Sequence, residues 1–521
     1  MDGDEQEDLL VNVSDSDDSP EESDAYLDLS RKVIQGPPFR HGLGRQCCFK
    51  KRAEFVGTGV LCLVSATALL VLLPLYLETS TRVADIYPSI LFCSATSVVL
   101  SFSCICIRAK FRIFSFSSFK KNVIPPISLL SVLQLGYCQG LGGLCIVYAL
   151  DRQRVLCHLQ DPMKGIILVF SMIYYFCFSK KIMGLQKVFC ATTIVIGLFV
   201  SVDYALCDEF HCRGYEREKV EDDGGQWNRT THFLWGLTYI AGLGLWCFHF
   251  SVLEGQIVSM HLENQLACKS RNSLLETISC MVSSQNGNIP PEGQWDPSEP
   301  SLIGNEYGAG ENSSGNRRNE DQHMPGGLAR QNGHINSTPS PSALSILFSV
   351  NLVSFFFIFI SFWTSMLHFV GKSSSWSELL NNSHIAILCH FQPDAANNSS
   401  LTSPACGSLA QYGWMFAASF LIFSFSAYHF LIMCQSSVFT VALITSALPL
   451  ANIFWSVFKL APNNGGYIEW WPNFTPELVC TLLGIPIIVT GLVLMCKAHW
   501  TNTTQKELCC TLRYHPRPAL T

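Results

Sequence analysis

Four polar residues stand close together in one apolar stretch of the chain, where charged groups are unfavourable. The stretch reads RVLCHLQDPMKGIILVFSMIYYFCF, and its polar members are His158, Gln160, Asp161 and Lys164. Asp161 and Lys164 are spaced i, i+3, so in a helix they share a face and can pair. A charged side chain at the bilayer centre costs about 2.5–3.5 kcal/mol, so it is a candidate for function. We expect Lys164 to contact an anionic solute group or a proton-coupled carboxylate. The alternative is that the helix starts later and these residues lie at the membrane surface.

Other polar side chains lie within other apolar stretches. Glu254 stands near the end of LGLWCFHFSVLEGQIVSM, five residues after His249, and it is the second candidate for function. The alternative is that its side chain simply extends to the membrane surface. The further candidates for solute binding are Tyr137, Gln139 and Asn452, with Gln134, Asn351 and Trp455 as weaker ones. Residues of these types more often pack or hydrogen-bond between helices than contact a ligand.

The chain carries no pattern that indicates catalysis. It has no Gly-Lys-Ser/Thr phosphate loop, which argues against ATP-driven pumping, and no cytosolic zinc-ligand spacing. No stretch resembles a nucleic-acid surface. We therefore expect a protein that is not an enzyme, uses no cofactor or metal, and binds no nucleic acid.

Long apolar runs must position the candidate residues. The 521 residues are 48% hydrophobic and 14% charged, against roughly 25% charged in soluble domains. A helix needs about 20 apolar residues to cross a bilayer. The sequence predicts an all-α integral membrane protein with about ten spans, at 55–77, 86–107, 123–149, 156–178, 186–206, 232–258, 343–369, 411–434, 436–460 and 477–497.

Two unrelated signals agree on the orientation of these spans. Basic residues cluster before the first span and after the second and fourth, which places these segments and both termini in the cytosol. Sequons are used only in the lumen, and the ones in predicted lumenal loops are Asn228, Asn381, Asn397, Asn398 and Asn473. Two cysteine pairs in these loops can form disulfides in an oxidising lumen; they are Cys207 with Cys212 and Cys389 with Cys406.

The organisation that follows is two inverted five-helix repeats joined by a long linker. Because five is odd, the second half enters the membrane in the opposite orientation, which is typical of transporters. The predicted parts are a disordered cytosolic tail (1–53), the first repeat (54–206), a lumenal loop (207–231), the sixth helix (232–260), a disordered cytosolic linker (261–342), helices seven to ten with a lumenal loop at 370–410 (343–497), and a cytosolic tail (498–521).

The acidic N-terminal tail carries short patterns that resemble sorting signals. Glu5, Leu9 and Leu10 resemble an acidic dileucine signal, and Tyr26 with Leu29 resembles a tyrosine-based one. Ser14 and Ser19 precede acidic residues, as at sites of acid-directed phosphorylation. These patterns favour binding of a clathrin adaptor and an endosomal or lysosomal location, with the Golgi as the alternative.

Three stretches resemble the drug/metabolite transporter superfamily, and within it the nucleotide-sugar transporters. The first contains Lys164, Lys180, Lys181, Leu185 and Gln186, the second is the sixth span ending in Glu254, and the third is SSVFTVALITSALPLANIFWSVF with ELVCTLLGIPIIVTGLVLM. The resemblance implies a ten-helix fold with inverted repeats, alternating access, and often exchange of one solute for another. Lys164 would then neutralise a phosphate or other anion.

These observations predict a secondary transporter that moves an organic, nucleotide-sugar-like anion across an intracellular membrane. The alternative is a non-transporting multi-pass receptor, scaffold or trafficking protein, suggested by the long tail and linker. The partners expected are a small-molecule solute and the lipid bilayer, and the sequence leaves a homo-oligomer open.

Overall fold

The structure is a computed structural model, and it divides into two units, residues 1–58 and 59–521. It describes residues 41–83, 85–110, 127–151, 154–155, 157–178, 183–201, 229–285, 342–367, 370–371, 373–392, 406–461, 467–472 and 476–513. The candidate residues that follow all belong to the second unit. One helix, α2 (His41–Val83), begins in the first unit and continues into the second.

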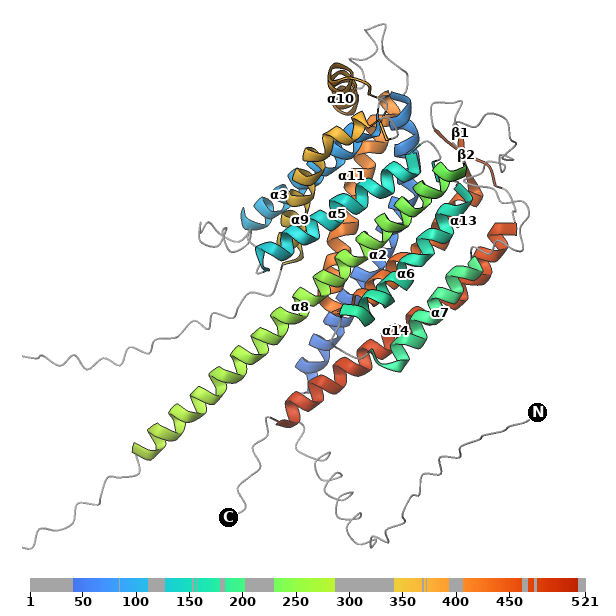
Figure 1. Cartoon of the computed structure of the whole chain (residues 1–521). Coiled ribbons are helices and arrows are strands. Elements are labelled where there is room, and N and C mark those ends of the chain that lie inside the picture. Colours follow the sequence, from blue (N-terminus) through green and yellow to red (C-terminus); the bar gives the residue numbers. More distant parts are fainter. Residues whose placement is uncertain are drawn as a thin grey trace, which may run out of the picture. The chain divides into compact units, whose positions relative to one another are not determined.

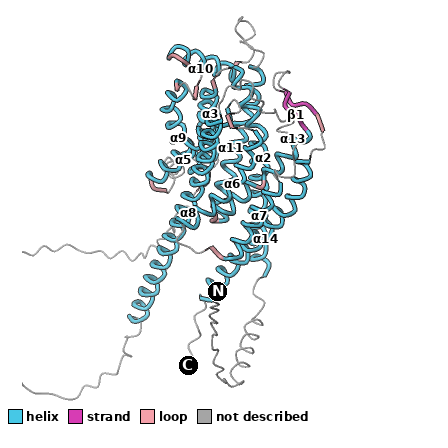
Figure 2. The backbone as a smooth tube through the Cα atoms, turned by 45° about the vertical axis from the view of Figure 1, so that its right-hand side comes forward, coloured by secondary structure: helices cyan, strands magenta, loops and turns pink. Residues whose placement is uncertain are grey.

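Helices make up nearly all of the described chain (Figures 1 and 2). Among the described residues, eight helical segments are long and apolar enough to cross a membrane. They are α2, α3 (Ile86–Lys110), α5 (Leu129–Leu150), α8 (Arg229–Gln285), α9 (Ala343–Ile360) with η2 (Ser361–Met366), α11 (Cys406–Cys434), α12 (Ser437–Thr445) with α13 (Ala447–Val457), and α14 (Pro476–Arg513). Two shorter apolar helices are α6 (Cys157–Phe178) and α7 (Leu185–Ser201). The chain is therefore a helical multi-pass membrane protein, and each predicted span coincides with an apolar helix.

Several predicted boundaries differ from the structure. The sixth helix, α8, continues to Gln285 rather than 260, so the first part of the predicted linker is helical. The tenth, α14, continues to Arg513 rather than 497, and α2 starts at His41 rather than near 55. The extensions of α8 and α14 have a simple cause, because no residue there ends a helix. Residues 256–285 contain no glycine or proline, and neither do residues 492–513.

Two elements were not expected from the sequence. The predicted loop at 370–410 contains a helix, α10 (Trp376–Phe391), whose N-cap Ser375 accepts a hydrogen bond from the Glu378 amide. In the part of the chain that the structure describes, the predicted all-α fold has one exception, an antiparallel hairpin of β1 (Phe458–Ala461) and β2 (Tyr467–Trp470). The sequence between these strands is PNNGG, a composition that favours a tight turn.

Small residues bring the helices close together. A Cβ atom at Gly484 would lie 2.6 Å from the carbonyl oxygen of Gly197, where α14 packs along α7. A Cβ atom at Gly242 would lie 3.0 Å from the carbonyl oxygen of Gly142, where α8 packs against α5. Glycines thus serve close helix packing in α5 and α14, and both helices are continuous.

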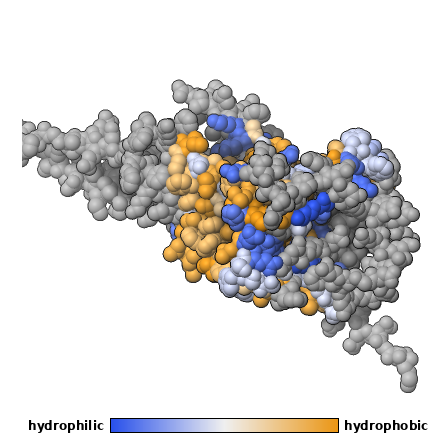
Figure 3. Space-filling view, turned by 90° about the horizontal axis from the view of Figure 1, so that it is seen from above, coloured by the Kyte–Doolittle hydropathy of each residue, from blue (hydrophilic) through white to orange (hydrophobic). Residues whose placement is uncertain are grey.

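Apolar side chains also remain on the outside of the bundle. In Figure 3 they gather on the flank of the described part, while hydrophilic side chains lie on the end that faces the viewer. Exposed residues of this kind include Leu130, Phe199 and Leu483. A large exposed apolar surface of this kind is expected where lipid, rather than water, surrounds the helices.

Candidate functional site

A cavity of about 280 Å³ lies among the helices of the second unit. Its wall is formed by residues of α2, α3, α5, α6, α8, α9, α11, α12 and α13. Leucine, isoleucine and aromatic side chains make up most of this wall. A mainly apolar cavity with a few polar groups is the usual form of a small-molecule site, and this volume is near the lower end of the common range.

Lys164 supplies the cavity wall with a cationic side chain from α6, and it is partly buried. An ammonium group next to an apolar wall is poorly solvated, so it binds an anionic group more strongly than it would in water. The structure therefore places Lys164, the first candidate for solute binding, in the wall of this cavity.

Aromatic rings form a second feature of the wall. Tyr76 stacks on Phe416 with ring centroids 5.4 Å apart, and Trp246 stacks on Phe423 at 6.2 Å. The first pair joins α2 to α11 and the second joins α8 to α11, and all four residues line the cavity. Such rings can pack against a flat ring or an apolar part of a solute.

Gln139 and Asn351 bring side-chain amides to the wall, and they begin a chain of hydrogen bonds. Gln139 Nε2 donates to Asn351 Oδ1 at 2.9 Å, and the Tyr428 hydroxyl donates to Gln139 Oε1 at 3.1 Å. The same hydroxyl lies 2.7 Å from His249 Nε2, and His249 Nδ1 lies 3.0 Å from the Leu135 carbonyl oxygen. We call this set the polar chain; it connects α9, α5, α11 and α8.

The ninth predicted span is interrupted where it meets the cavity. Helix α12 ends at Thr445 and α13 begins at Ala447, and Thr445 and Leu448 both line the cavity. Proline has no amide hydrogen, so Pro449 cannot donate to the carbonyl of Thr445 four residues earlier. The Thr445 carbonyl therefore lacks the donor that a continuous helix would supply four residues later.

The other predicted binding residues have different positions. Gln160 is 3% exposed and donates to the Val155 carbonyl oxygen at 2.9 Å. Tyr137 is 47% exposed and packs edge-on against Phe357. These two, with Asn452 and Glu254, are not among the residues that line the cavity in the described part of the chain. The side chains of His158 and Asp161 lie outside the described residues.

Glu254 instead joins two helices. Its Oε2 accepts a hydrogen bond from the Ser437 amide at 2.8 Å and another from the Ser437 hydroxyl at 2.5 Å. A carboxylate is favourable here because Ser437 is the first residue of α12, where amide groups lack partners within the helix. Glu254 therefore acts as a cap that connects α8 to α12.

A buried ion pair was not predicted from the sequence. Arg154 and Asp151 are each 1% exposed, with Nη2 and Oδ2 3.5 Å apart. Arg154 Nη1 donates to the Tyr148 carbonyl oxygen at 2.9 Å, Nη2 donates to that of Val370, and the guanidinium lies 4.5 Å from the Trp235 ring. The sequence DRQR places opposite charges at i, i+3 spacing, which could have indicated this ion pair. The same sequence is equally typical of an exposed turn.

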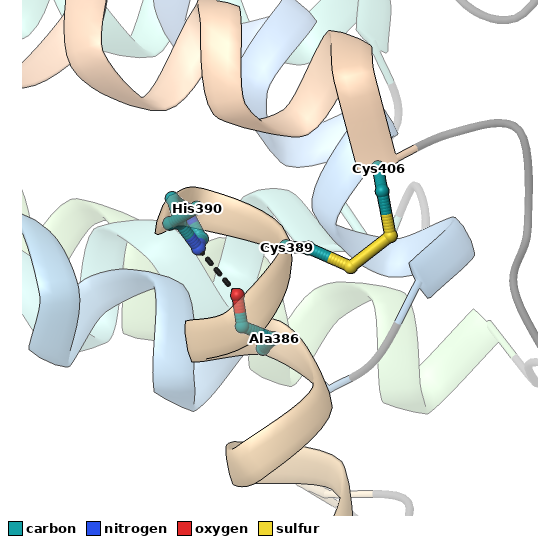
Figure 4. Close-up of a disulfide and its surroundings, with 4 residues drawn as sticks. All are labelled: Ala386, Cys389, His390 and Cys406. Carbon is teal, nitrogen blue, oxygen red and sulfur yellow. Dashed lines mark hydrogen bonds between the residues drawn. A yellow bond between two sulfur atoms is a disulfide. The ribbon is translucent and has the colours of Figure 1, made fainter. Parts of the chain in front are cut away.

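The structure contains one of the two cysteine pairs as a disulfide, between Cys389 of α10 and Cys406 at the start of α11 (Figure 4). Asn381 is exposed on α10, where a glycan can be attached. Other predicted sites lie outside the described residues: Cys207, Cys212, Asn228, Asn397, Asn398, Asn473, Glu5, Leu9, Leu10, Tyr26, Leu29, Ser14 and Ser19.

A comparison with models of known protein families and with curated proteins finds no match to this chain. The fold and the site thus define its class on their own: a multi-pass membrane protein with an apolar cavity among its helices. Within the described residues, no group of three or more His, Cys, Asp or Glu side chains is placed to hold a metal ion.

Proposed function

We propose that this protein is a secondary transporter that moves an organic anion across an intracellular membrane by alternating access. The observation that carries the proposal is the cavity, because residues from both halves of the chain enclose it and Lys164 supplies it with a cation. The anionic class follows from Lys164, and the aromatic wall suits a solute that also has a ring or an apolar part. The resemblance to nucleotide-sugar transporters favours a nucleotide sugar, which would require the cavity to widen.

Support for two inverted repeats comes from the pairing of helices. If span n corresponds to span n+5, helices beside the pseudo-twofold axis pack against their own counterparts. Three such pairs are in contact: α3 with α9, α6 with α12, and α7 with α14. The same rule relates two further contacts. The contact of α5 with α9 joins spans three and seven, and its counterpart joins spans eight and two, which is the contact of α11 with α3. This arrangement favours ten spans, and the basic residues beside the spans are the basis for placing both termini in the cytosol.

The single-residue interruption of the ninth span at Ser446 is a further reason for preferring transport. Discontinuous helices near the membrane midplane leave backbone groups free to bind a solute or a coupling ion. The end of α12 and the start of α13 meet at the cavity wall. An endosomal or lysosomal membrane, with the Golgi as the alternative, remains our proposal for the location, and the tail motifs are its basis.

Uptake and exchange in proteoliposomes test the proposal. The full-length protein is assayed against nucleotide sugars, nucleotides, amino acids and organic cations, with and without a pH gradient. Lys164→Ala should reduce transport of an anionic solute tenfold or more, because a hydrogen bond to a charged group contributes about 1.5–3 kcal/mol. Lys459→Ala is the matched control, because Lys459 lies on β1 over the Trp471 ring, away from the cavity wall.

The scaffold alternative predicts the opposite pattern. Deletion of residues 1–40 and 286–341 should leave liposome transport intact if the helical bundle is a transporter, and alter only its location in cells. The scaffold reading would be established by two results together: the wild-type protein transports no solute of the panel, and this deletion abolishes the protein's function in cells. Transport of an organic cation with equal rates in wild type and Lys164→Ala would refute the anionic solute class.

A further inference from the structure

The direction of the hydrogen bonds in the polar chain depends on the protonation of His249. The Leu135 carbonyl can only accept, so His249 Nδ1 carries a hydrogen. Tyr428 has one hydroxyl hydrogen, and it donates this hydrogen to Gln139 Oε1. The contact of 2.7 Å between the hydroxyl oxygen and His249 Nε2 is then a hydrogen bond only when Nε2 is protonated as well. This direction of the chain is the one that a protonated imidazole requires, and the same heavy-atom positions admit the reverse direction with a neutral ring.

Loss of the Nε2 proton reverses the chain. The Tyr428 hydroxyl then donates to the bare Nε2, and Gln139 must turn its amide so that its NH₂ group donates to the Tyr428 oxygen. Asn351 must turn in the same way, to donate to the Gln139 oxygen. The Nε2–H bond is the only covalent bond that changes, because the other steps are rotations of a hydroxyl and two amides.

The reversal changes what Asn351 presents at the end of the chain. With His249 protonated, Asn351 Nδ2 is buried and has no hydrogen-bond partner among the described residues. An unsatisfied buried amide costs about 1–3 kcal/mol, and an acceptor oxygen of a solute in the adjoining cavity would remove this cost. With His249 neutral, the carbonyl of Asn351 takes that place, and it repels an acceptor.

We propose that His249 is a proton-binding site that couples proton movement to the organic anion, so that both cross the membrane in the same direction. The inference rests on the proposed function and adds the coupling ion to it. Proton binding at His249 turns a donor of Asn351 toward acceptor oxygens, and the added positive charge partly offsets the charge of the anion. By reciprocity, the bound anion favours the protonated imidazole to the same extent.

His249 is enclosed by few ionisable groups. It is 2% exposed, and the helices packed against α8 are α5, α6, α11 and α12. In the described part of these helices and of α8, α12 contributes no ionisable side chain. The ionisable side chains nearest in sequence to the polar chain or lining the cavity are Tyr137 and Cys138 on α5, Lys164 and Tyr174 on α6, Tyr428, His429 and Cys434 on α11, and Tyr239, Cys247 and Glu254 on α8. His249 is the imidazole among them that touches Tyr428, which makes it the group to titrate.

Binding at two pH values tests the coupling. UDP-glucose and gluconate serve as probes, because neither changes its charge between pH 5.5 and 7.5. The full-length protein in nanodiscs should bind such an anion on the order of fivefold or more tightly at pH 5.5. His249→Gln should bind with an affinity that does not depend on pH. Tyr428→Phe keeps the imidazole but interrupts the chain, so it should lose the pH dependence too.

A matched control lies next to Tyr428. His429 stacks on Phe425 with ring centroids 5.9 Å apart, and it is not one of the residues that form the polar chain. His429→Gln should therefore keep the pH dependence of the wild-type protein. Equal loss of pH dependence in His429→Gln and His249→Gln would overturn the assignment to His249.

A second measurement needs no solute. Infrared difference spectra of the solute-free protein between pH 5.5 and 7.5, with labelled histidine, should show imidazolium bands together with a shift of a side-chain amide carbonyl. Both signals should be absent in His249→Gln and present in His429→Gln. Because this readout is independent of transport, it separates the two proposals.

The outcomes distinguish the inference from the function on which it rests. Binding of a probe with no pH dependence and no infrared signal would overturn the proton site and leave the transporter. An infrared signal with no binding of either probe would support the proton site and overturn the choice of anion. Absence of both would overturn the proposal for His249.

Discussion

His390 shows how one side chain ties a surface helix to the membrane helices. It is 2% exposed, its Nδ1 donates to the Ala386 carbonyl oxygen at 2.6 Å within α10, and its Nε2 lies 3.0 Å from the Tyr76 hydroxyl of α2. Figure 4 shows it beside the Cys389–Cys406 disulfide. The ring also stacks on Phe92 of α3, with centroids 4.0 Å apart. Because Tyr76 lines the cavity, His390 connects α10 to the cavity wall.

This arrangement predicts that α10 packs less firmly at acidic pH. Burial lowers the pKa of His390 below its ordinary value of 6.5. The folded protein then binds the proton less readily than the unfolded chain, so its stability is highest above pH 6.5 and falls as the pH drops below that value. Hydrogen–deuterium exchange, corrected for the intrinsic rate, should show faster exchange in α10 at pH 5.5 than at pH 7.5.

Two controls accompany this measurement. His390→Gln should remove the difference in exchange between the two pH values in α10. Helices α7 and α14 are not among the elements that pack against α10, which are α3, α11 and η2. Their amides should therefore exchange at the same rate in both proteins. Equal protection of α10 at both pH values in the wild-type protein would contradict the role assigned to His390.

At the scale of elements, the pair α7 and α14 depends on the absence of side chains. A Cβ atom at Gly484 would lie 2.6 Å from the Gly197 carbonyl oxygen and 2.7 Å from the Ser201 Cβ. A Cβ atom at Gly491 would lie 2.5 Å from a side-chain carbon of Ile194. Backbone atoms limit the approach at Gly484, so the two helices would have to move apart to accept a larger residue.

Gly484→Ala should therefore lower the stability of the bundle, although alanine is the better helix former. Overpacking of this kind costs about 1–3 kcal/mol, and it should appear as a lower melting temperature in detergent or nanodiscs. Gly165→Ala on α6 is the matched control, because nothing lies within 4 Å of the Cβ it would add. A melting temperature that is equal or higher in Gly484→Ala would show that the α7–α14 contact is looser than the structure has it.

For the whole molecule, the membrane class and the helices could be predicted because they depend on local composition. Lys164 could be singled out for the same reason, since a charge in an apolar stretch is visible in the sequence alone. The aromatic wall could not, because Trp246 and Phe423 look like any other apolar residues until the rotation of each helix is known. The capping role of Glu254 and the contact of His249 with Tyr428 depend on residues far apart in the chain.

The number of spans is the prediction that concerns the molecule as a whole. The short helices α6 and α7 decide it, because the other apolar helices are long enough to cross a membrane. The 17 residues of α7 extend about 26 Å as a helix, slightly less than the roughly 30 Å of a hydrocarbon core. If α6 and α7 cross, the chain has ten spans; if they form a hairpin that stays on the lumenal side of the membrane, it has eight.

A glycosylation site inserted between these helices distinguishes the two topologies. A flexible segment with one Asn-Ser-Thr sequon is placed at Gly184, which is exposed and has nothing within 4 Å of an added Cβ. Ten spans put this position in the cytosol, so it should stay unmodified, whereas native Asn381 on α10 should carry a glycan that Asn381→Gln removes. Modification at the inserted site would establish eight spans. It would also remove the correspondence of α6 with α12 and of α7 with α14, and with it the inverted repeat on which alternating access is argued.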